Sequence, residues 1–283
     1  MFAIEIGYID LDKMYKTPQG IRWQKIGKKK YAIPNGNKIV LVEQTKNWLK
    51  MTCNEEEFWN IWYYYFDMGY DYAEAAFKMR SNSKILKKAQ IVSSGLRIAN
   101  MDIFESLVVN ILLEHYPRKE VKLLLNNICS VCTKKRKNRL SGIEISWYEF
   151  PSFRMILDNA EALSLYKIYD GWEEIMSLCM FMENGTFDPY AYKGYKQRMQ
   201  EFKEFGIMSP KTANMICLYG YNMKEAFPMD NHLKEVMYLH DIDISKFNEI
   251  YDVRGLASRY LLYYEKNVKK FARSYLQMAK DVL

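Results

Sequence analysis

The sequence has few features of a membrane or secreted protein. None of its apolar runs approaches the roughly 20 residues that a transmembrane helix requires. The longest run, Ser106 to Leu113, is interrupted by Asn110. The N-terminal stretch MFAIEIGYIDLDK carries acidic residues where a signal peptide carries positive charge. We therefore expect an intracellular, cytoplasmic protein with no signal peptide and no membrane partner.

Cysteine and histidine are also scarce. The 283 residues include five cysteines and three histidines, and an odd, sparse cysteine count does not indicate a disulfide framework. Cys129 and Cys132 have the spacing of metal ligands, but structural zinc requires four ligands, and no second pair follows. We therefore expect no metal site and interpret these two thiols as part of a helix end.

The charge is only mildly basic. Lys and Arg exceed Asp and Glu by 41 − 34 = +7, which permits a polyanionic partner without requiring one. The short basic stretch Lys134–Arg139 is typical of a solvated loop. The 23 tyrosines could stack on bases, but tyrosines at helical or strand spacing are more often half-buried in a core.

The order of the predicted elements indicates an α+β fold. Residues 1–80 are predicted to form an N-terminal antiparallel sheet with a trailing helix, because strand-like segments follow one another without helical crossovers. The predicted strands are residues 30–34, 37–43 and 48–53, and Asn35-Gly36 supplies the first turn. Asn54 and the acidic residues after it are typical of a helix start.

Residues 81–283 are predicted to form a mostly helical domain. Asp102 and Pro117 are typical of the first residues of helices. The predicted helices comprise residues 102–113, 117–129, 161–169, 171–183, 190–205, 210–219, 231–239 and 254–283.

One stretch of this domain has a pattern that favours chemistry. Gly206 permits a turn after a helix, Ser209 is a good N-cap and Pro210 suits the first helical position. Lys211 then lies in the first turn of the next helix, where the field of the helix favours the neutral, nucleophilic amine. Asp230, 19 residues later, precedes another helix and is a natural N-cap. Each residue alone is more often an ordinary surface or capping residue.

Together with segments elsewhere, this pair resembles the 8-oxoguanine DNA glycosylase/AP lyase branch of the helix-hairpin-helix DNA glycosylase superfamily. In that family an L-P-G-V-G-x-K-x-A hairpin and a P-V-D segment deliver the catalytic Lys and Asp. Lys211-Thr-Ala213 and Pro228-Met-Asp230 match them. The segments QGIRW (19–23), GLRI (95–98), DIFESL (102–107), FPS (150–152) and GLASRYLLYY (255–264) resemble further family motifs in the same order.

The resemblance implies an enzyme that binds double-stranded DNA containing a damaged base and flips that base into a pocket. Lys211 would attack C1′ of the sugar, and a Schiff base would lead to β-elimination of the strand. Asp230 would stabilise the charge that develops on the sugar. The family needs no cofactor. We expect a monomer, associated with the nucleoid if the source is bacterial.

The resemblance also implies two groups of binding residues. The base pocket would comprise Pro18, Met215, Tyr219, Ser258 and Leu262. The DNA contacts would comprise Gly206, Met208, Ser209, His232, His115 and Tyr116. Several of these differ from the family pattern: both hairpin glycines are replaced by Ile207 and Ser209, and the pocket Gln and Phe by Ser258 and Leu262.

Those differences leave alternatives open. The first keeps the chemistry but changes the lesion or the opposite base. The second is a DNA-binding relative without catalysis, against which the retention of both Lys211 and Asp230 argues. The third, a helical protein-interaction domain, explains none of the matched segments.

Overall fold

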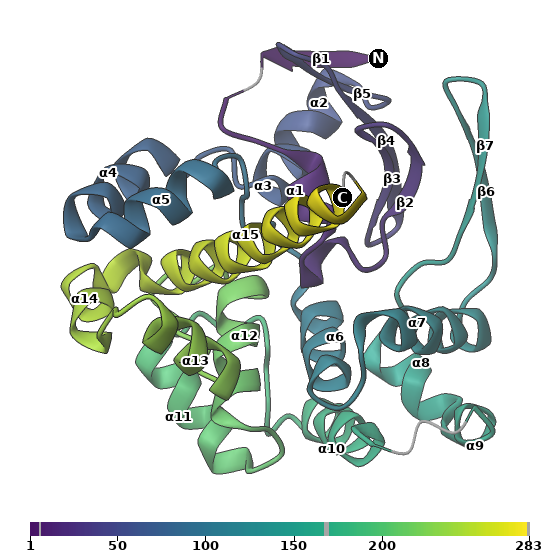
Figure 1. The fold of residues 1–283 in the computed structure, drawn as a ribbon. Coiled ribbons are helices and arrows are strands. Elements are labelled where there is room, and N and C mark those ends of the chain that lie inside the picture. Colours follow the sequence, from purple (N-terminus) through teal and green to yellow (C-terminus); the bar gives the residue numbers. More distant parts are fainter. Residues whose placement is uncertain (6, 167–169, 282–283) are drawn as a thin grey trace.

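The fold is of the predicted α+β class (Figure 1). The computed structural model describes residues 1–5, 7–166 and 170–281, with side chains up to residue 268. The predicted helix end at 167–169 and the last residues of the predicted C-terminal helix, 282–283, lie outside the described residues. Within the described ranges, no helix combines the length and apolar character needed to cross a membrane.

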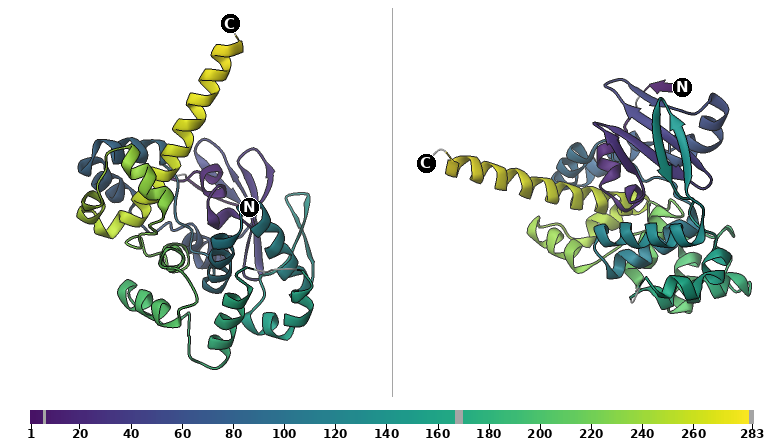
Figure 2. Two further views of the ribbon diagram at one scale, coloured as in Figure 1. Left: turned by 60° about the horizontal axis from the view of Figure 1, so that its bottom comes forward. Right: turned by 90° about the vertical axis from the view of Figure 1, so that its right-hand side faces the viewer.

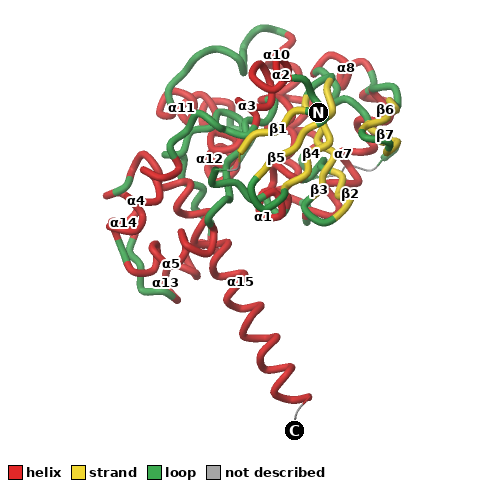
Figure 3. Tube along the Cα trace, turned by 90° about the horizontal axis from the view of Figure 1, so that it is seen from above, coloured by secondary structure: helices red, strands yellow, loops and turns green. Residues whose placement is uncertain are grey.

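The N-terminal sheet has the order β1-β5-β4-β3-β2, and every neighbouring pair is antiparallel (Figure 3). Its strands are β1 (Phe2–Glu5), β2 (Gln24–Gly27), β3 (Lys30–Asn35), β4 (Lys38–Gln44) and β5 (Trp48–Met51). The three predicted strands are confirmed with small changes at their ends. Asn35 pairs with Lys38, so the tight turn consists of Gly36 and Asn37 rather than Asn35 and Gly36. The edge strands β1 and β2 were not predicted.

The basic stretch at 134–139 is not a loop, and that prediction was wrong. It forms most of β6 (Arg136–Leu140), which pairs with β7 (Ile143–Trp147) through a turn at Ser141-Gly142, where both φ angles are positive. Most of the apolar side chains lie on β7: Ile145 and Trp147 are buried against Ala32, Ile39 and Leu41 of the sheet, and β6 adds only the partly buried Leu140 at its end. Because β6 itself presents mainly charged residues, its own sequence carries no strand pattern.

Helices make up most of the remaining chain. The longer ones are α4 (Tyr72–Asn82), α5 (Lys84–Ser93), α6 (Ile103–His115), α7 (Arg118–Cys132), α10 (Trp172–Glu183), α11 (Tyr195–Phe205), α12 (Pro210–Tyr219), α13 (Asn231–Leu239) and α15 (Arg254–Asp281). The shorter ones are α1 (Leu11–Tyr15), η1 (Pro18–Gly20), α2 (Glu55–Glu57), η2 (Phe58–Trp62), α3 (Tyr63–Tyr65), α8 (Phe153–Asp158), α9 (Ala160–Ser164), α14 (Ile244–Glu249) and η3 (Tyr251–Val253). The predicted helix at 190–205 starts only at Tyr195, because Gly194 is its N-cap.

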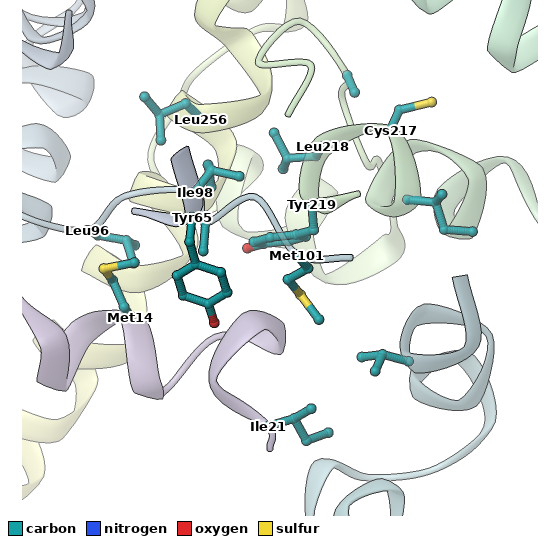
Figure 4. Packing of buried hydrophobic residues seen from close by; sticks show 14 of the residues in the cluster. Met14, Ile21, Tyr65, Leu96, Ile98, Met101, Cys217, Leu218, Tyr219 and Leu256 are labelled. Carbon is teal, nitrogen blue, oxygen red and sulfur yellow. The ribbon is translucent and has the colours of Figure 1, made fainter. Parts of the chain in front are cut away.

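One hydrophobic core joins the sheet to the helices. Figure 4 shows Met14 and Ile21 from the N-terminal segment near Tyr65 and Met101, with Tyr219 of α12 and Leu256 of α15 in the same cluster. Helix α15 packs along α5, and its far end projects beyond the body of the protein (Figure 2). Because the core is continuous, the division at residue 80 stays a prediction.

A buried polar network ties the N-terminal half to the segment that leads into α13. The Asp67 carboxylate forms an ion pair of 2.8 Å with Lys224 and accepts hydrogen bonds from Tyr72 (2.8 Å) and Asn222 (2.7 Å). Arg97 donates to the Asp67 carbonyl at 2.7 Å. Burial lowers the pKa of Lys224, and Asp67 partly offsets that effect. Lys224 therefore depends on Asp67 as its counter-ion.

We predict that Asp67→Ala destabilises the protein by about 3–5 kcal/mol, because it leaves the Lys224 ammonium buried without its counter-ion. Urea denaturation measures this as a lower midpoint with an unchanged m-value. The control is Glu249→Ala, which breaks the exposed pair with Lys246 and should cost less than about 1 kcal/mol. Equal losses for both variants would contradict the structural role of the network.

Candidate active site

The hairpin between α11 and α12 has the geometry that its residues predict. Helix α11 ends at Phe205, and Gly206 adopts a left-handed conformation with φ +65°, which glycine accepts without strain. Ser209 is the N-cap of α12, and its hydroxyl accepts a hydrogen bond of 3.2 Å from the Thr212 amide. Pro210 takes the first helical position. Lys211 is therefore the second residue of α12.

Lys211 and Asp230 lie side by side. The distance from Lys211 Nζ to Asp230 Oδ2 is 3.7 Å, and the two side chains are 38% and 27% exposed. The other carboxylate oxygen of Asp230 accepts a hydrogen bond of 2.7 Å from the Leu233 amide, so Asp230 is the N-cap of α13. One oxygen thus anchors the side chain, and the other remains beside the amine, within reach of solvent.

Asn214 fixes the chain segment that leads to Asp230. Its side-chain oxygen accepts hydrogen bonds from the Tyr195 hydroxyl (2.7 Å) and from the Phe227 amide (2.9 Å). Further along, the Gly255 amide donates to the Lys224 carbonyl at 2.7 Å. A Cβ at Gly255 would lie 1.9 Å from the Ala226 carbonyl oxygen, so only glycine permits this close approach. These contacts place Asp230 relative to α12.

A cavity of about 420 Å³ lies one helical turn of α12 from Lys211. Its lining includes Pro18, Met215, Tyr219 and Leu262, four of the five residues predicted for the base pocket. Met215 is one helical turn beyond Lys211 on α12, so the cavity begins beside the amine. Its volume falls within the usual range for small-molecule pockets. The structure therefore brings these predicted residues together next to Lys211.

The fifth predicted pocket residue, Ser258, does not line this cavity. It is fully buried, and its hydroxyl donates a hydrogen bond of 2.7 Å to the Gly255 carbonyl. Sequence reasoning instead missed its neighbour Arg259, which does line the cavity. The signal was available, since Arg259 is three residues from Leu262 on α15 and residues at that spacing share a helix face.

Four of the six residues predicted to contact DNA lie close together. His115, Gly206, Met208 and Ser209 line one hollow between the end of α6 and the hairpin. Glu174 also lines it, and its carboxylate lies 3.2 Å from His115 Nε2. The structure thus brings the hairpin and the end of α6 to a common surface.

Tyr116 and His232 differ in their surroundings. The Tyr116 ring packs against the hydrophobic core, and its hydroxyl accepts a hydrogen bond of 2.9 Å from the Asp170 amide. This contact holds Tyr116 in place and favours a structural role. His232 follows Asp230 in the first turn of α13 and is 62% exposed, so it is accessible to a partner.

The cysteines are buried thiols. Burial raises the pKa of Cys129 to about 12 and that of Cys132 to about 11, at the end of α7. Among the described residues, no group of three or more His, Cys, Asp or Glu side chains is placed to hold a metal ion.

The whole chain resembles solved structures of DNA glycosylases. A Clostridium acetobutylicum 8-oxoguanine glycosylase/lyase, in complex with double-stranded DNA containing cytosine opposite 8-oxoG, matches with a TM-score of 0.82 and 23% identity over 95% of this chain and 99% of that one. MBOgg1 in complex with a low-affinity DNA ligand matches with a TM-score of 0.81 and 20% identity over 95% and 100%. A 3-methyladenine DNA glycosylase from Archaeoglobus fulgidus is more distant, with a TM-score of 0.69 and 14% identity over 94% and 99%. These likenesses show the fold.

A sequence comparison matches the N-terminal part of the chain. Residues 1–107 match the family model of the 8-oxoguanine DNA glycosylase N-terminal domain. A comparison with curated proteins found no match. The chain therefore has a DNA glycosylase fold. The predicted resemblance to the 8-oxoguanine DNA glycosylase family is confirmed.

The cap at Asp230 gives a stability prediction. We expect Asp230→Ala to lower the free energy of unfolding by about 1 kcal/mol, because the Leu233 amide loses its acceptor. Asp230→Asn keeps a capping oxygen and should therefore leave stability close to that of the wild type. Thermal or urea denaturation measures both variants. A loss for Asp230→Asn as large as that for Asp230→Ala would contradict the capping geometry.

Proposed function

We propose that the chain is a bifunctional DNA glycosylase and AP lyase of base-excision repair, and that it excises an oxidised purine, with 8-oxoguanine as the leading substrate. The observation that carries this proposal is the amine of Lys211 at 3.7 Å from Asp230, beside a cavity of the size of a base pocket. The match of the N-terminal domain to the 8-oxoguanine DNA glycosylase family supports the choice of substrate.

The proposed reaction uses Lys211 as the nucleophile. Its neutral amine attacks C1′ while the bond from C1′ to the base breaks, and the departing base takes up a proton. Loss of the amine proton and opening of the sugar ring give a Schiff base between Nζ and C1′. Removal of a proton from C2′ then expels the 3′ phosphate, which cuts the strand by β-elimination.

Asp230 supports this reaction by charge. Positive charge develops on the sugar as the base leaves, and a carboxylate beside C1′ stabilises it. The cap contact with the Leu233 amide uses only one carboxylate oxygen, so Oδ2 can face the sugar. The hydrogen bond also fixes the side chain, which lowers the cost of reorganisation during the reaction.

The surface around the pair is proposed to hold a duplex. The hairpin at 206–209 precedes the N-terminus of α12, where helical amide groups favour a phosphate, and the exposed His232 lies at the start of α13. The hairpin carries Ile207 and Ser209 in place of the family glycines, so fewer backbone groups can approach a phosphate closely. We therefore expect weaker phosphate binding at this hairpin than a glycine hairpin provides.

A second candidate keeps this chemistry and changes the lesion. Its specific support is the change of two predicted pocket residues, since Ser258 and Leu262 stand where the family pattern has Gln and Phe. A DNA-binding protein without catalysis is the remaining alternative, and the same experiment separates it from both.

We predict that borohydride traps a covalent adduct between the wild-type protein and a duplex that carries 8-oxoguanine opposite cytosine. Lys211→Gln should give no adduct, because the amide cannot form a Schiff base. Lys84→Gln, an exposed lysine of α5, is the matched control and should give the wild-type yield. Gel electrophoresis of the reduced mixture measures the adduct.

The outcomes distinguish the candidates. An adduct on an abasic duplex but none with 8-oxoguanine would favour the same chemistry on another lesion. Duplex binding without any adduct would favour the non-catalytic alternative. An adduct of undiminished yield from Lys211→Gln would refute the assignment of Lys211.

A further inference from the structure

A positive charge lies in the wall of the cavity, and no carboxylate of the described residues forms a close ion pair with it. Arg259 lines the cavity together with Met215 and Tyr219. Among the described residues, no carboxylate oxygen lies within 4.0 Å of its guanidinium nitrogens. Burial lowers the pKa of Arg259, while Tyr219 and Asp230 partly offset that effect. An arginine stays charged even so, and a partly buried cation is costly without a partner.

The contacts of Arg259 leave donors available. Nε lies 3.3 Å from the Ser258 hydroxyl, Nη2 donates to the Pro228 carbonyl at 3.2 Å, and Nη1 has only a weak acceptor, the Met215 sulfur, at 3.6 Å. A guanidinium carries five N–H donors in a planar fork. After these contacts, each terminal nitrogen retains one N–H without a protein acceptor among the described residues. The contacts to Pro228 and Ser258 hold the fork in place.

The position of Arg259 connects it to the reacting centre. Pro228, whose carbonyl it binds, is two residues before Asp230, and Met215 is one helical turn beyond Lys211. The exposed lysines Lys16 and Lys266 also line the cavity. A group that enters this cavity beside Lys211 therefore meets hydrogen-bond donors and positive charge.

The hydrogen-bond donors of the Arg259 guanidinium determine which ligand it can bind. Guanine presents O6 as a hydrogen-bond acceptor on its major-groove edge. In 8-oxoguanine N7 carries a proton and is a donor, so O6 is the acceptor on that edge to which the N–H groups of Arg259 can donate. A purine with an amino group at C6 presents donors to the same fork and would leave both sides unsatisfied. The cavity thus favours a purine with a carbonyl oxygen at C6 over one with an amine there.

We propose that Arg259 determines the specificity of the enzyme, by donating hydrogen bonds to the C6 carbonyl edge of the flipped purine. This proposal rests on the proposed function. It assigns the choice of substrate to Arg259, which neither attacks the sugar nor stabilises the positive charge that develops on it.

The test compares two lesions that differ at C6. Single-turnover excision is measured for 8-oxoguanine and 8-oxoadenine, each opposite cytosine, with cleavage of a preformed abasic duplex as a third assay. The variants are Arg259→Met and Arg259→Lys, and the matched control is Arg80→Met, an exposed arginine of α4. Thermal unfolding verifies that each variant is folded.

We expect the wild type to excise 8-oxoguanine faster than 8-oxoadenine. Arg259→Met should lose about 10- to 150-fold on 8-oxoguanine, the range that corresponds to one hydrogen bond from a charged donor. Its excision of 8-oxoadenine and its cleavage of the abasic duplex should stay at the wild-type level. Arg259→Lys keeps the positive charge but not the planar guanidinium, so its rate of 8-oxoguanine excision should lie between those of Arg259→Met and the wild type. Arg80→Met should match the wild type in all three assays.

Three results would overturn the proposal: no preference of the wild type for the C6 carbonyl, no loss in a folded Arg259→Met protein, or equal losses on both lesions and the abasic duplex. Failure of the proposed function is distinguishable, since the wild type would then cleave neither a lesion duplex nor the abasic duplex.

Discussion

The candidate site depends on the close approach of the N-terminal ends of α12 and α13. Lys211 lies in the first turn of α12, and Asp230 caps α13, with 3.7 Å between amine and carboxylate. The partial positive charge of a helix N-terminus stabilises the Asp230 carboxylate. The pair therefore combines an amine with a carboxylate that is held in a favourable field. This combination suits a nucleophile and the anion that assists it.

Holding two helix ends in this relation requires a rigid connection between them. Asn214 binds the segment before Asp230 to α12 and α11, and Gly255 allows α15 to approach the same segment closely. The buried contact of Lys224 with Asp67 fastens the connection to the N-terminal half. The sheet domain thereby contributes to the geometry of a site that lies among the helices.

Local signals in the sequence were sufficient for the hairpin. Gly206, Ser209 and Pro210 each have a conformational preference that acts within a few residues, and the structure places all three as predicted. Strand β6 was missed because its pairing is non-local: its apolar support comes from β7 and the sheet. Matching positions to the family motif selected Ser258, but packing against other helices sets the side of α15 that faces the cavity. The spacing of three residues from Leu262 would have indicated Arg259 instead.

The most direct test of the site is to locate the covalent bond. Borohydride reduction of the wild-type protein on an abasic duplex, followed by proteolysis and mass spectrometry, identifies the residue that carries the DNA remnant. Our account predicts that the remnant is attached to Nζ of Lys211. Attachment to another lysine or to the N-terminal amine would contradict it, because the amine beside Asp230 would then not be the nucleophile.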